Sequence, residues 1–333
     1  MAAVVSQSSP DPAALRAALV ASPALCPLEW NDDRTAALFA RLSEADYRAA
    51  SFLDRRALQP GTPTGAVPWS LAEPWLVDLP RRCDFIFHIS HCGSTLLSRL
   101  MGTAPGVFSV REPGILRRLD AADGEARIDA VLGLLSRVFR PAERPLVKAT
   151  SVVNAVADRL MARAPESRAI LIGLPAETFL AAVLDGSRSD IESHAEDRLA
   201  RLVRLGLVKP EATATGLGEH AAAAWACEMA TLGALAKTHP HRTHWIDFDR
   251  FLASPAATLA ASIAFLGHTA DAATILAGPL MQRYAKKTDV AYDRDLRTSL
   301  LAASRERHGH EIAAGLDWLD RHGLNDLAAD VTP

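Results

Sequence analysis

The chain lacks several features that would place it in a specialised class of protein. It has only four cysteines in 333 residues, and no two of them form a CxxC pair. Cysteines so few and so scattered are typical of reduced thiols and do not indicate a disulfide framework. The N-terminal segment has no basic stretch followed by an apolar one, so it does not resemble a secretory signal. We therefore expect a cytoplasmic protein.

A long apolar run and an excess of basic charge are also missing. No stretch approaches the roughly eighteen uncharged apolar residues that a membrane span needs, so we expect no membrane partner. Lys and Arg total 36 against 39 Asp and Glu, which gives a formal net charge of −3. A nucleic-acid-binding protein would show a basic excess or a basic stripe, so we expect no nucleic-acid partner either. Any anion-binding site must be local.

The overall composition, with 49% hydrophobic and 23% charged residues, is that of an ordinary globular protein. Residues 1–80 differ in pattern from the rest of the chain. Helical periodicity over Ala13–Val20 and Thr35–Leu58 predicts helices, and the Pro- and Gly-rich stretch after Leu58 predicts a loop that ends near Pro80. We expect a helical N-terminal extension over residues 1–80, packed on a main domain over residues 81–333.

The main domain alternates short apolar runs with longer amphipathic ones. Strands are expected over Asp84–Ser90, Pro145–Lys148, Arg168–Ile172 and Thr243–Ile246. Helices are expected over Gly93–Thr103, Ala126–Phe139, Val152–Ala164, Ala176–Leu184, Ser193–Leu207, Leu217–Thr238 and Pro255–Leu266. Strands separated by helices predict an α/β fold with a mostly parallel sheet flanked by helices.

The turn after the first of these strands is the most informative segment. A hydrophobic strand runs into a turn of small residues, His91–Thr95, and a helix begins at once. This arrangement points backbone N–H groups and the positive end of a helix dipole at one place. Gly93 allows the close approach of a phosphate or sulfate, and Ser94 and Thr95 offer hydroxyl groups to the same oxygens. Either hydroxyl would equally serve as an ordinary helix N-cap.

The turn is not a Walker A loop. That motif needs a Gly-Lys-Ser/Thr sequence, because its lysine reaches the β- and γ-phosphates. Here Ser94 follows Gly93, and no lysine occurs between Asp84 and Pro145. An ATP-dependent kinase is therefore disfavoured.

The segment CGSTLLSRL at 92–100 resembles the 5′-phosphosulfate loop of sulfotransferases, whose fold is a P-loop NTPase-like parallel sheet. Three further segments are similar to that family in the same order. They are Arg111–Pro113, the strand segment PLVKATS at 145–151, and the late segment that begins WIDFDRF at 245. The resemblance covers residues 84–267.

The resemblance implies transfer of a sulfuryl group from 3′-phosphoadenosine 5′-phosphosulfate (PAPS) to a small-molecule alcohol or amine, without a metal. It implies that Gly93, Ser94 and Thr95 hold the phosphosulfate, in a loop that also contains His91 and Cys92. His91 stands at the family's basic position, where a structural histidine is an equal explanation. Lys148 would neutralise charge on the bridging oxygen.

Two departures concern the 3′-phosphate. The family's arginine and serine ligands correspond here to Gly173 and Ala181, which supply no charge and no hydroxyl. Arg188, or Arg283, Lys286 and Lys287 of a late basic loop, would compensate, although the late loop is also explained as a solvated surface.

A general base is also needed, and Thr150 stands where many family members have a histidine. Glu112, in the loop where an acceptor would lie, is the predicted base. Its structural alternatives are pairing with Arg111 and capping a helix that starts near Gly114. The histidines of the segment HPHRTH, at 239, 241 and 244, lack acidic or cysteine companions, so no metal site is expected.

The sequence thus favours a PAPS-dependent sulfotransferase-like enzyme. Two alternatives stay open. One is a P-loop protein that uses another nucleotide or phosphoryl donor, and the other is a binding or regulatory protein that kept the fold and lost the PAPS site. The sequence does not indicate the acceptor or the oligomeric state.

Overall fold

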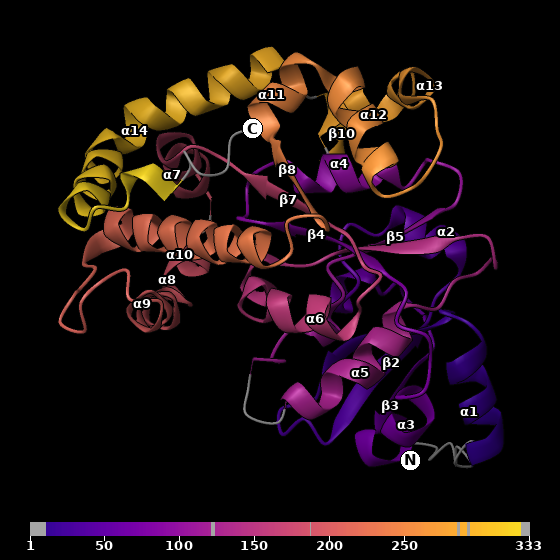
Figure 1. The fold of residues 1–333 in the computed structure, drawn as a ribbon. Coiled ribbons are helices and arrows are strands. Elements are labelled where there is room, and N and C mark those ends of the chain that lie inside the picture. The colour runs from indigo at the N-terminus through magenta and orange to yellow at the C-terminus, as the bar shows by residue number, and fades with distance from the viewer. Residues whose placement is uncertain (1–10, 121–123, 187, 285–286, 292–293, 328–333) are drawn as a thin grey trace, which may run out of the picture.

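A computed structural model describes residues 11–120, 124–186, 188–284, 287–291 and 294–327. Its centre is a five-stranded sheet with the order β5-β6-β4-β7-β8, in which every neighbouring pair of strands is parallel (Figure 1). The strands are β4 (Asp84–His88), β5 (Val107–Arg111), β6 (Arg144–Lys148), β7 (Ala169–Gly173) and β8 (Thr243–Asp247). The predicted parallel α/β fold is confirmed.

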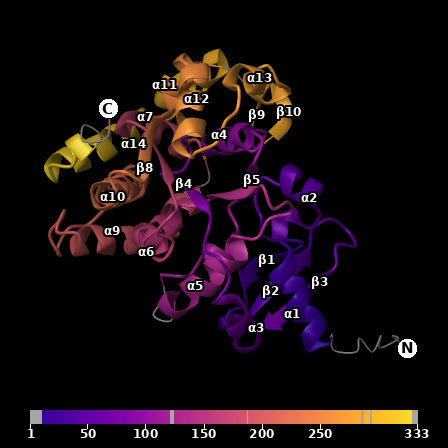
Figure 2. The ribbon, with the colours of Figure 1, turned by 45° about the vertical axis from the view of Figure 1, so that its right-hand side comes forward.

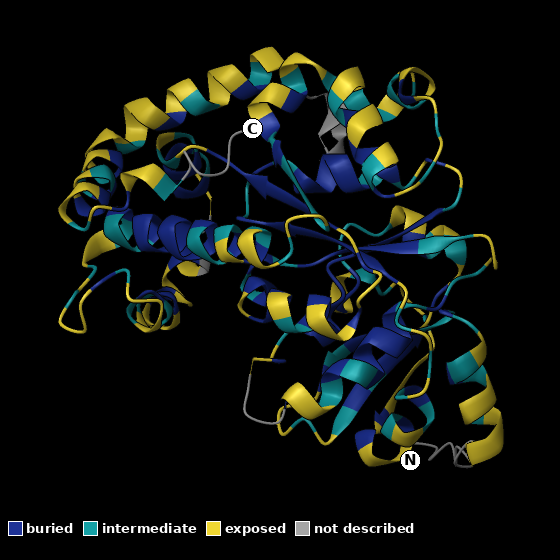
Figure 3. Ribbon diagram, in the orientation of Figure 1, coloured by how far each residue is buried: buried dark blue, intermediate teal, exposed yellow. Residues whose placement is uncertain are grey.

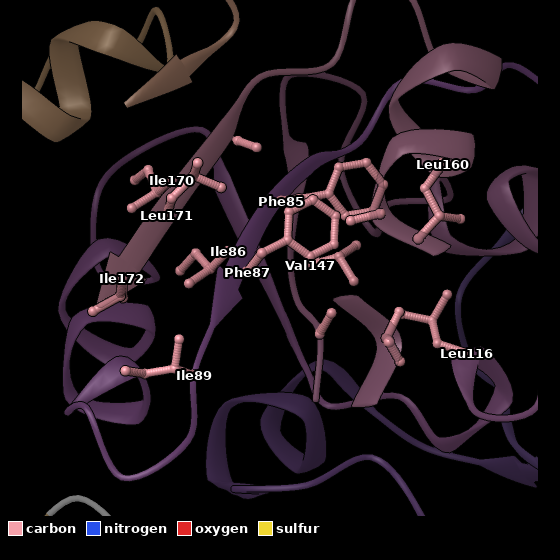
Figure 4. Close-up of a cluster of buried hydrophobic side chains, with 14 of the residues drawn as sticks. Phe85, Ile86, Phe87, Ile89, Leu116, Val147, Leu160, Ile170, Leu171 and Ile172 are labelled. Carbon is pink, nitrogen blue, oxygen red and sulfur yellow. The ribbon is translucent and has the colours of Figure 1, made fainter. Parts of the chain in front are cut away.

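The central strands are apolar runs because the sheet is covered on both faces. Phe85 and Phe87 of β4 stack with ring centroids 5.1 Å apart, and the residues of β4, β5 and β7 are all buried (Figure 3). Figure 4 shows Phe85 beside Val147 and Ile86 beside Ile170, so the core extends across neighbouring strands. Parallel pairing sets the carboxyl ends of β4, β5 and β6 side by side, with Lys148 opposite both Ile86 and Arg111.

Helices cover both faces of the sheet (Figures 1 and 2). On one side lie α4 (Ser94–Met101), α11 (Phe248–Ala253) and α12 (Pro255–Phe265), and on the other α5 (Gly124–Leu135), α6 (Ala157–Arg163) and α10 (Gly216–Thr238). The remaining elements of this part are the 3₁₀ turns η2 (Gly114–Leu116), η3 (Ser151–Val156) and η4 (Pro279–Gln282), α7 (Ala176–Leu184), α8 (Arg188–Glu192), α9 (Ala195–Arg204), α13 (Ala272–Leu276), β9 (Arg283–Tyr284), β10 (Lys287–Ala291) and α14 (Arg294–Arg321).

The predicted strands and helices of the main domain all correspond to observed elements. Several observed elements were not predicted, and the strand β5 and the long helix α14 are the main ones. The strand β5 was missed because its five residues include Ser109 and Arg111, which break the apolar run. The long helix α14 was missed because its polar composition gives it no apolar stripe, and it packs along α7 and α10. Within the described ranges, no helix combines the length and the apolar character that crossing a bilayer requires.

The region before Pro80 is not purely helical, so the predicted helix over Thr35–Leu58 is wrong. The strands β1 (Leu25–Trp30), β2 (Ala36–Arg41) and β3 (Thr64–Pro68) form an antiparallel sheet. The helix α1 (Pro12–Ala21) precedes it, α2 (Glu44–Ala49) and η1 (Arg55–Ala57) connect β2 to β3, and α3 (Trp69–Leu76) follows it. An Asn31 side chain that accepts the Ala36 N–H at 2.9 Å closes the turn between β1 and β2. Pairing of β2 with strands on both sides then outweighs the helical periodicity of this segment.

Two buried arginines join this N-terminal region to the main domain through backbone carbonyl groups. Arg111, at the end of β5, donates to the carbonyl oxygens of Tyr47, Arg48 and Ala50. Arg137 donates to those of Leu19, Ser22 and Leu25 at 2.7–3.0 Å. Burial lowers the pKa of Arg111 to about 9, with a further contribution from the charges of Arg99 and Arg48.

Candidate active site

The loop of residues 90–95 connects β4 to α4 in a strained conformation. Ser90, His91 and Gly93 have φ values of 68°, 49° and 72°, in the left-handed region that residues other than glycine rarely adopt. Successive turn residues of this kind are the backbone geometry of anion-binding concavities in proteins, and the loop lies next to the positive end of the α4 dipole. Strain of this kind is stored preferentially at functional sites.

The two hydroxyl residues of the loop do not cap the helix. The N-cap of α4 is Gly93, which has no side chain, and no side-chain hydrogen bond closes this end. Ser94 and Thr95 instead begin the helix and line the large cavity at its N-terminus. The N-cap explanation of Ser94 and Thr95 is therefore wrong.

Two features require glycine at position 93, its left-handed backbone angle and the close contact with Phe248. A Cβ atom at this position would lie 2.0 Å from the Phe248 ring, which therefore rests directly on the loop. Phe248 stacks against Phe251, and the Arg297 guanidinium lies 5.0 Å from the Phe248 ring centroid. Gly93 thus lets the first residue of α11 close over the loop.

The cavity has a volume of about 790 Å³, within the usual range of ligand sites. One wall is the 90–95 loop with α7, and others are formed by η2, η3 and α14. Charged residues dominate its polar lining. They are the basic residues Arg56, Arg117, Arg118, Lys148, Arg198 and Arg297, and the acidic residues Glu112, Asp120, Asp185 and Asp197.

Lys148 and Glu112 form a buried ion pair on the cavity wall. Lys148 is the last residue of β6 and is 1% exposed, and Glu112 directly follows the neighbouring strand β5. Lys148 Nζ contacts Glu112 Oε1, and the Glu112 N–H donates to the Lys148 carbonyl oxygen at 2.6 Å. Glu112 adopts a left-handed φ of 45°. The parallel register of β5 and β6 thus brings the two predicted catalytic residues together, and Glu112 pairs with Lys148, not with Arg111.

The other residues of the loop differ in their placement. His91 lines the cavity, whereas the Cys92 side chain is buried outside the cavity lining, and burial raises the pKa of its thiol. Cys92 would therefore contact a bound anion only through its backbone. The Ser90 N–H donates to His88 Nδ1 at 3.1 Å, and Ser90 Oγ lies 2.6 Å from Ser151 Oγ of η3. These contacts hold Ser90 against the end of β4 and the start of η3.

The residues considered for a 3′-phosphate are not gathered at one place. Gly173 is covered by Met229 and Trp245, and it is absent from the cavity lining, whereas Ala181 lines the cavity with a methyl group. Arg188 is exposed, pairs with Glu192 at 2.8 Å, and is also absent from the lining. Lys286 and the side chains of Arg283 and Lys287 lie outside the described residues.

Sequence reasoning did not identify Arg198, Arg297 or Phe248 as site residues. Arg297, in the first turn of α14, is 7% exposed and donates to Asp249 at 3.0 Å, while its Nη2 atom is buried without a hydrogen-bond partner among the described residues. No local motif marks these positions, because α9 and α14 reach the cavity only through the tertiary fold.

The described ranges contain no group of three His, Cys, Asp or Glu side chains arranged to hold a metal ion. In the segment HPHRTH, His239 Nε2 instead lies 2.9 Å from Asp158 and His239 Nδ1 lies 2.7 Å from Arg242.

Neither a family model nor a curated protein sequence matches the chain. Among solved structures, the sulfotransferase domain from the curacin biosynthetic pathway is 14% identical, with a TM-score of 0.41, over 74% of this chain and 98% of that domain. A sulfotransferase from Alicyclobacillus acidocaldarius is 15% identical, with a TM-score of 0.39, over 75% of this chain and 98% of that chain. The sulfotransferase domain of the Synechococcus PCC 7002 olefin synthase is 17% identical, with a TM-score of 0.41, over 77% of this chain and 97% of that domain. All three of these structures are described as sulfotransferases or sulfotransferase domains.

Proposed function

We propose that the protein transfers a sulfuryl group from PAPS to the hydroxyl or amine of a small molecule. The observation that carries this proposal is the buried Lys148–Glu112 pair, which lines the same cavity as the strained 90–95 loop. The loop offers an anion site, the lysine offers a charge for a leaving oxygen, and the glutamate offers a proton acceptor. These are the three groups that a metal-free sulfuryl transfer needs.

The residues present fit the donor. The left-handed backbone at Ser90, His91 and Gly93, with the hydroxyls of Ser94 and Thr95, suits the phosphosulfate end, and a cavity of about 790 Å³ is large enough for a nucleotide. When bound, PAPS supplies the sulfuryl group, and its bond to the 5′-phosphate oxygen breaks as the bond from sulfur to the acceptor forms.

Glu112 would take the proton of the acceptor. Its carboxylate oxygen Oε1 contacts Lys148 Nζ on the cavity wall. A proton on Glu112 cancels the negative charge beside Lys148. The lysine charge then becomes available to the departing oxygen at the moment when that oxygen becomes negative. Lys148 would thus orient the base first and stabilise the leaving group second.

Arg297 is the residue that we assign to the 3′-phosphate. Arg188 and Gly173 are absent from the cavity lining and Ala181 carries no polar group, whereas Arg297 lines the cavity beside Phe248 and has a buried unpartnered nitrogen within the described chain. The α14 helix that carries it also packs on α7, where Ser304 donates to the carbonyl of Ala181 at 2.5 Å. An arginine on α14 would therefore replace the ligands that β7 and α7 lack at Gly173 and Ala181.

Calorimetric titration with adenosine 3′,5′-bisphosphate and with AMP tests the proposal. We expect the bisphosphate to bind at least about tenfold more tightly, the scale of one charged hydrogen bond. Transfer from labelled PAPS to a panel of phenols, sugars and amines should follow. Equal binding of the two nucleotides, together with no transfer, would contradict a PAPS-dependent enzyme.

A second function is favoured by one specific observation. Gly173 and Ala181 lack the charge and the hydroxyl that a 3′-phosphate requires, which suits a P-loop protein with a donor nucleotide that has no 3′-phosphate. Tighter binding of AMP than of the bisphosphate in the same titration would support this alternative.

A further inference from the structure

Arg198, on the cavity wall, belongs to a second charged group in which two arginines share one carboxylate. Arg198 and Arg201 of α9 both approach Glu228 of α10, which is 1% exposed. Arg201 Nη2 donates to Glu228 Oε1 at 2.7 Å, and Asn154 Nδ2 donates to Oε2 at 2.9 Å. Arg198 Nε stands farther away, 3.5 Å from Oε1. Glu228 is therefore already engaged by Arg201 and Asn154.

Arg198, Arg201 and Glu228 together carry a net formal charge of +1. Two guanidinium groups face a single carboxylate, and Arg198 is only 9% exposed, so solvent screens its charge poorly. The Nε atom of Arg198 is buried without a hydrogen-bond partner, and its two terminal nitrogens make no hydrogen bond within the described chain. Since Arg198 lines the cavity, these terminal N–H groups are the donors that it offers there.

A guanidinium group presents its N–H donors in a planar fork that matches the two oxygens of a carboxylate, sulfate or phosphate. Asp120 and Asp197 also line the cavity and would repel an anion, but both are exposed, so solvent weakens their effect. The buried Arg198 should therefore make this part of the cavity favour an anionic group.

Apolar side chains lie close to the same group. Val152, Val153 and Val156 line the cavity from η3, the turn that also carries Asn154 and so contacts Glu228. The turn η3 begins three residues after Lys148, so it links the end of β6 to the residues around Glu228. This part of the cavity suits a molecule with an apolar body and one anionic group.

We propose that the acceptor is such a molecule, with its anionic group held by Arg198 and its apolar body against the three valines. The inference rests on the proposed function, because it names the class of acceptor for that reaction. The sulfated product would then carry two anionic groups, the original one and the new sulfate ester or sulfamate.

The test uses hydroxyl compounds prepared in matched forms, for example 4-hydroxyphenylacetate, its neutral amide, and the corresponding phosphate ester of 4-hydroxyphenylethanol. With labelled PAPS, kcat/KM should be about tenfold or more higher for the anionic forms, the scale of one charged hydrogen bond. Comparison of the carboxylate with the phosphate ester identifies which oxyanion fits. Arg198→Gln should remove the preference, and Arg198→Lys should restore part of it.

The matched control is Arg204→Gln, which removes the same charge from an exposed position of the same helix, outside the cavity lining. Its preference for anionic acceptors should equal that of the wild type. All variants should keep wild-type affinity for adenosine 3′,5′-bisphosphate, which also shows that they fold.

Calorimetry with the same compounds separates this inference from the proposed function. If no compound is sulfated but the anionic forms bind in an Arg198-dependent manner, the proposed reaction fails and the anion site stands. If the charged and neutral forms behave alike, or no anionic form binds, the inference is overturned. A loss of bisphosphate affinity in Arg198→Gln would also overturn it, because Arg198 would then belong to the donor site.

Discussion

Substitution of Gly93 by alanine separates two effects that this glycine combines. The residue has a φ of 72°, and a Cβ atom there would lie 2.0 Å from two ring atoms of Phe248. Alanine in the left-handed region costs about 1–2 kcal/mol at any site. The contact with Phe248 adds a second cost, because the buried ring must move off the loop and away from Phe251 and Arg297.

The fold contains a control for the first effect alone. Gly206 has a φ of 70°, and a Cβ atom there would meet nothing within 4 Å. Gly206→Ala should therefore lower the free energy of unfolding by about 1–2 kcal/mol. Overpacking of a buried site costs about 1–3 kcal/mol more, so Gly93→Ala should lower it by about 2–5 kcal/mol.

Urea unfolding of the two variants measures the difference. The double variant Gly93→Ala/Phe248→Leu provides a further test, because a smaller residue at 248 leaves room for the new methyl group. Its loss of stability should be less than that of the two single variants added together. If Gly93→Ala costs no more than Gly206→Ala, the idea that Phe248 rests directly on the loop and closes this wall of the cavity is refuted.

Three further predictions concern the cavity, and a fourth concerns pH. Glu112→Gln should lower kcat by about a hundredfold with little change in bisphosphate affinity, if Glu112 is the base. Lys148→Met should lower the free energy of unfolding by about 3–5 kcal/mol, because it leaves a buried carboxylate unpaired, and the double variant with Glu112→Gln should regain part of this loss in urea unfolding. Arg297→Ala should weaken bisphosphate binding in calorimetry by about 1.5–3 kcal/mol and leave AMP binding unchanged; an equal loss for both nucleotides would contradict the assignment. Partial burial and the nearby Arg198 charge lower the pKa of His194 below its ordinary value of 6.5. The folded state should therefore be most stable above pH 6.5 and lose stability as the pH falls from 6.5 toward the lowered pKa. Thermal melts at several pH values should show this loss, and His194→Gln should reduce it.

The sequence predicted the parts of the fold that depend on local patterns. Apolar runs such as that of β4 predicted the parallel sheet, and the turn of small residues predicted the start of α4. The helix predicted over Thr35–Leu58 was wrong, because β2 has partners on both sides and strand pairing between distant segments leaves no local signal. For the same reason Arg198 and Arg297 could not be predicted, since α9 and α14 meet the cavity only in the folded chain.

The way in which Arg111 and Arg137 hold the N-terminal region has a consequence for how that region tolerates sequence change. Both arginines donate to backbone carbonyl groups, which every residue type possesses. Substitutions at exposed positions such as Arg48 therefore leave these hydrogen bonds in place, whereas inserting or deleting one residue would displace several carbonyl groups together. The length of the segments around Ser22 and Arg48 should consequently be under stronger constraint than their side chains.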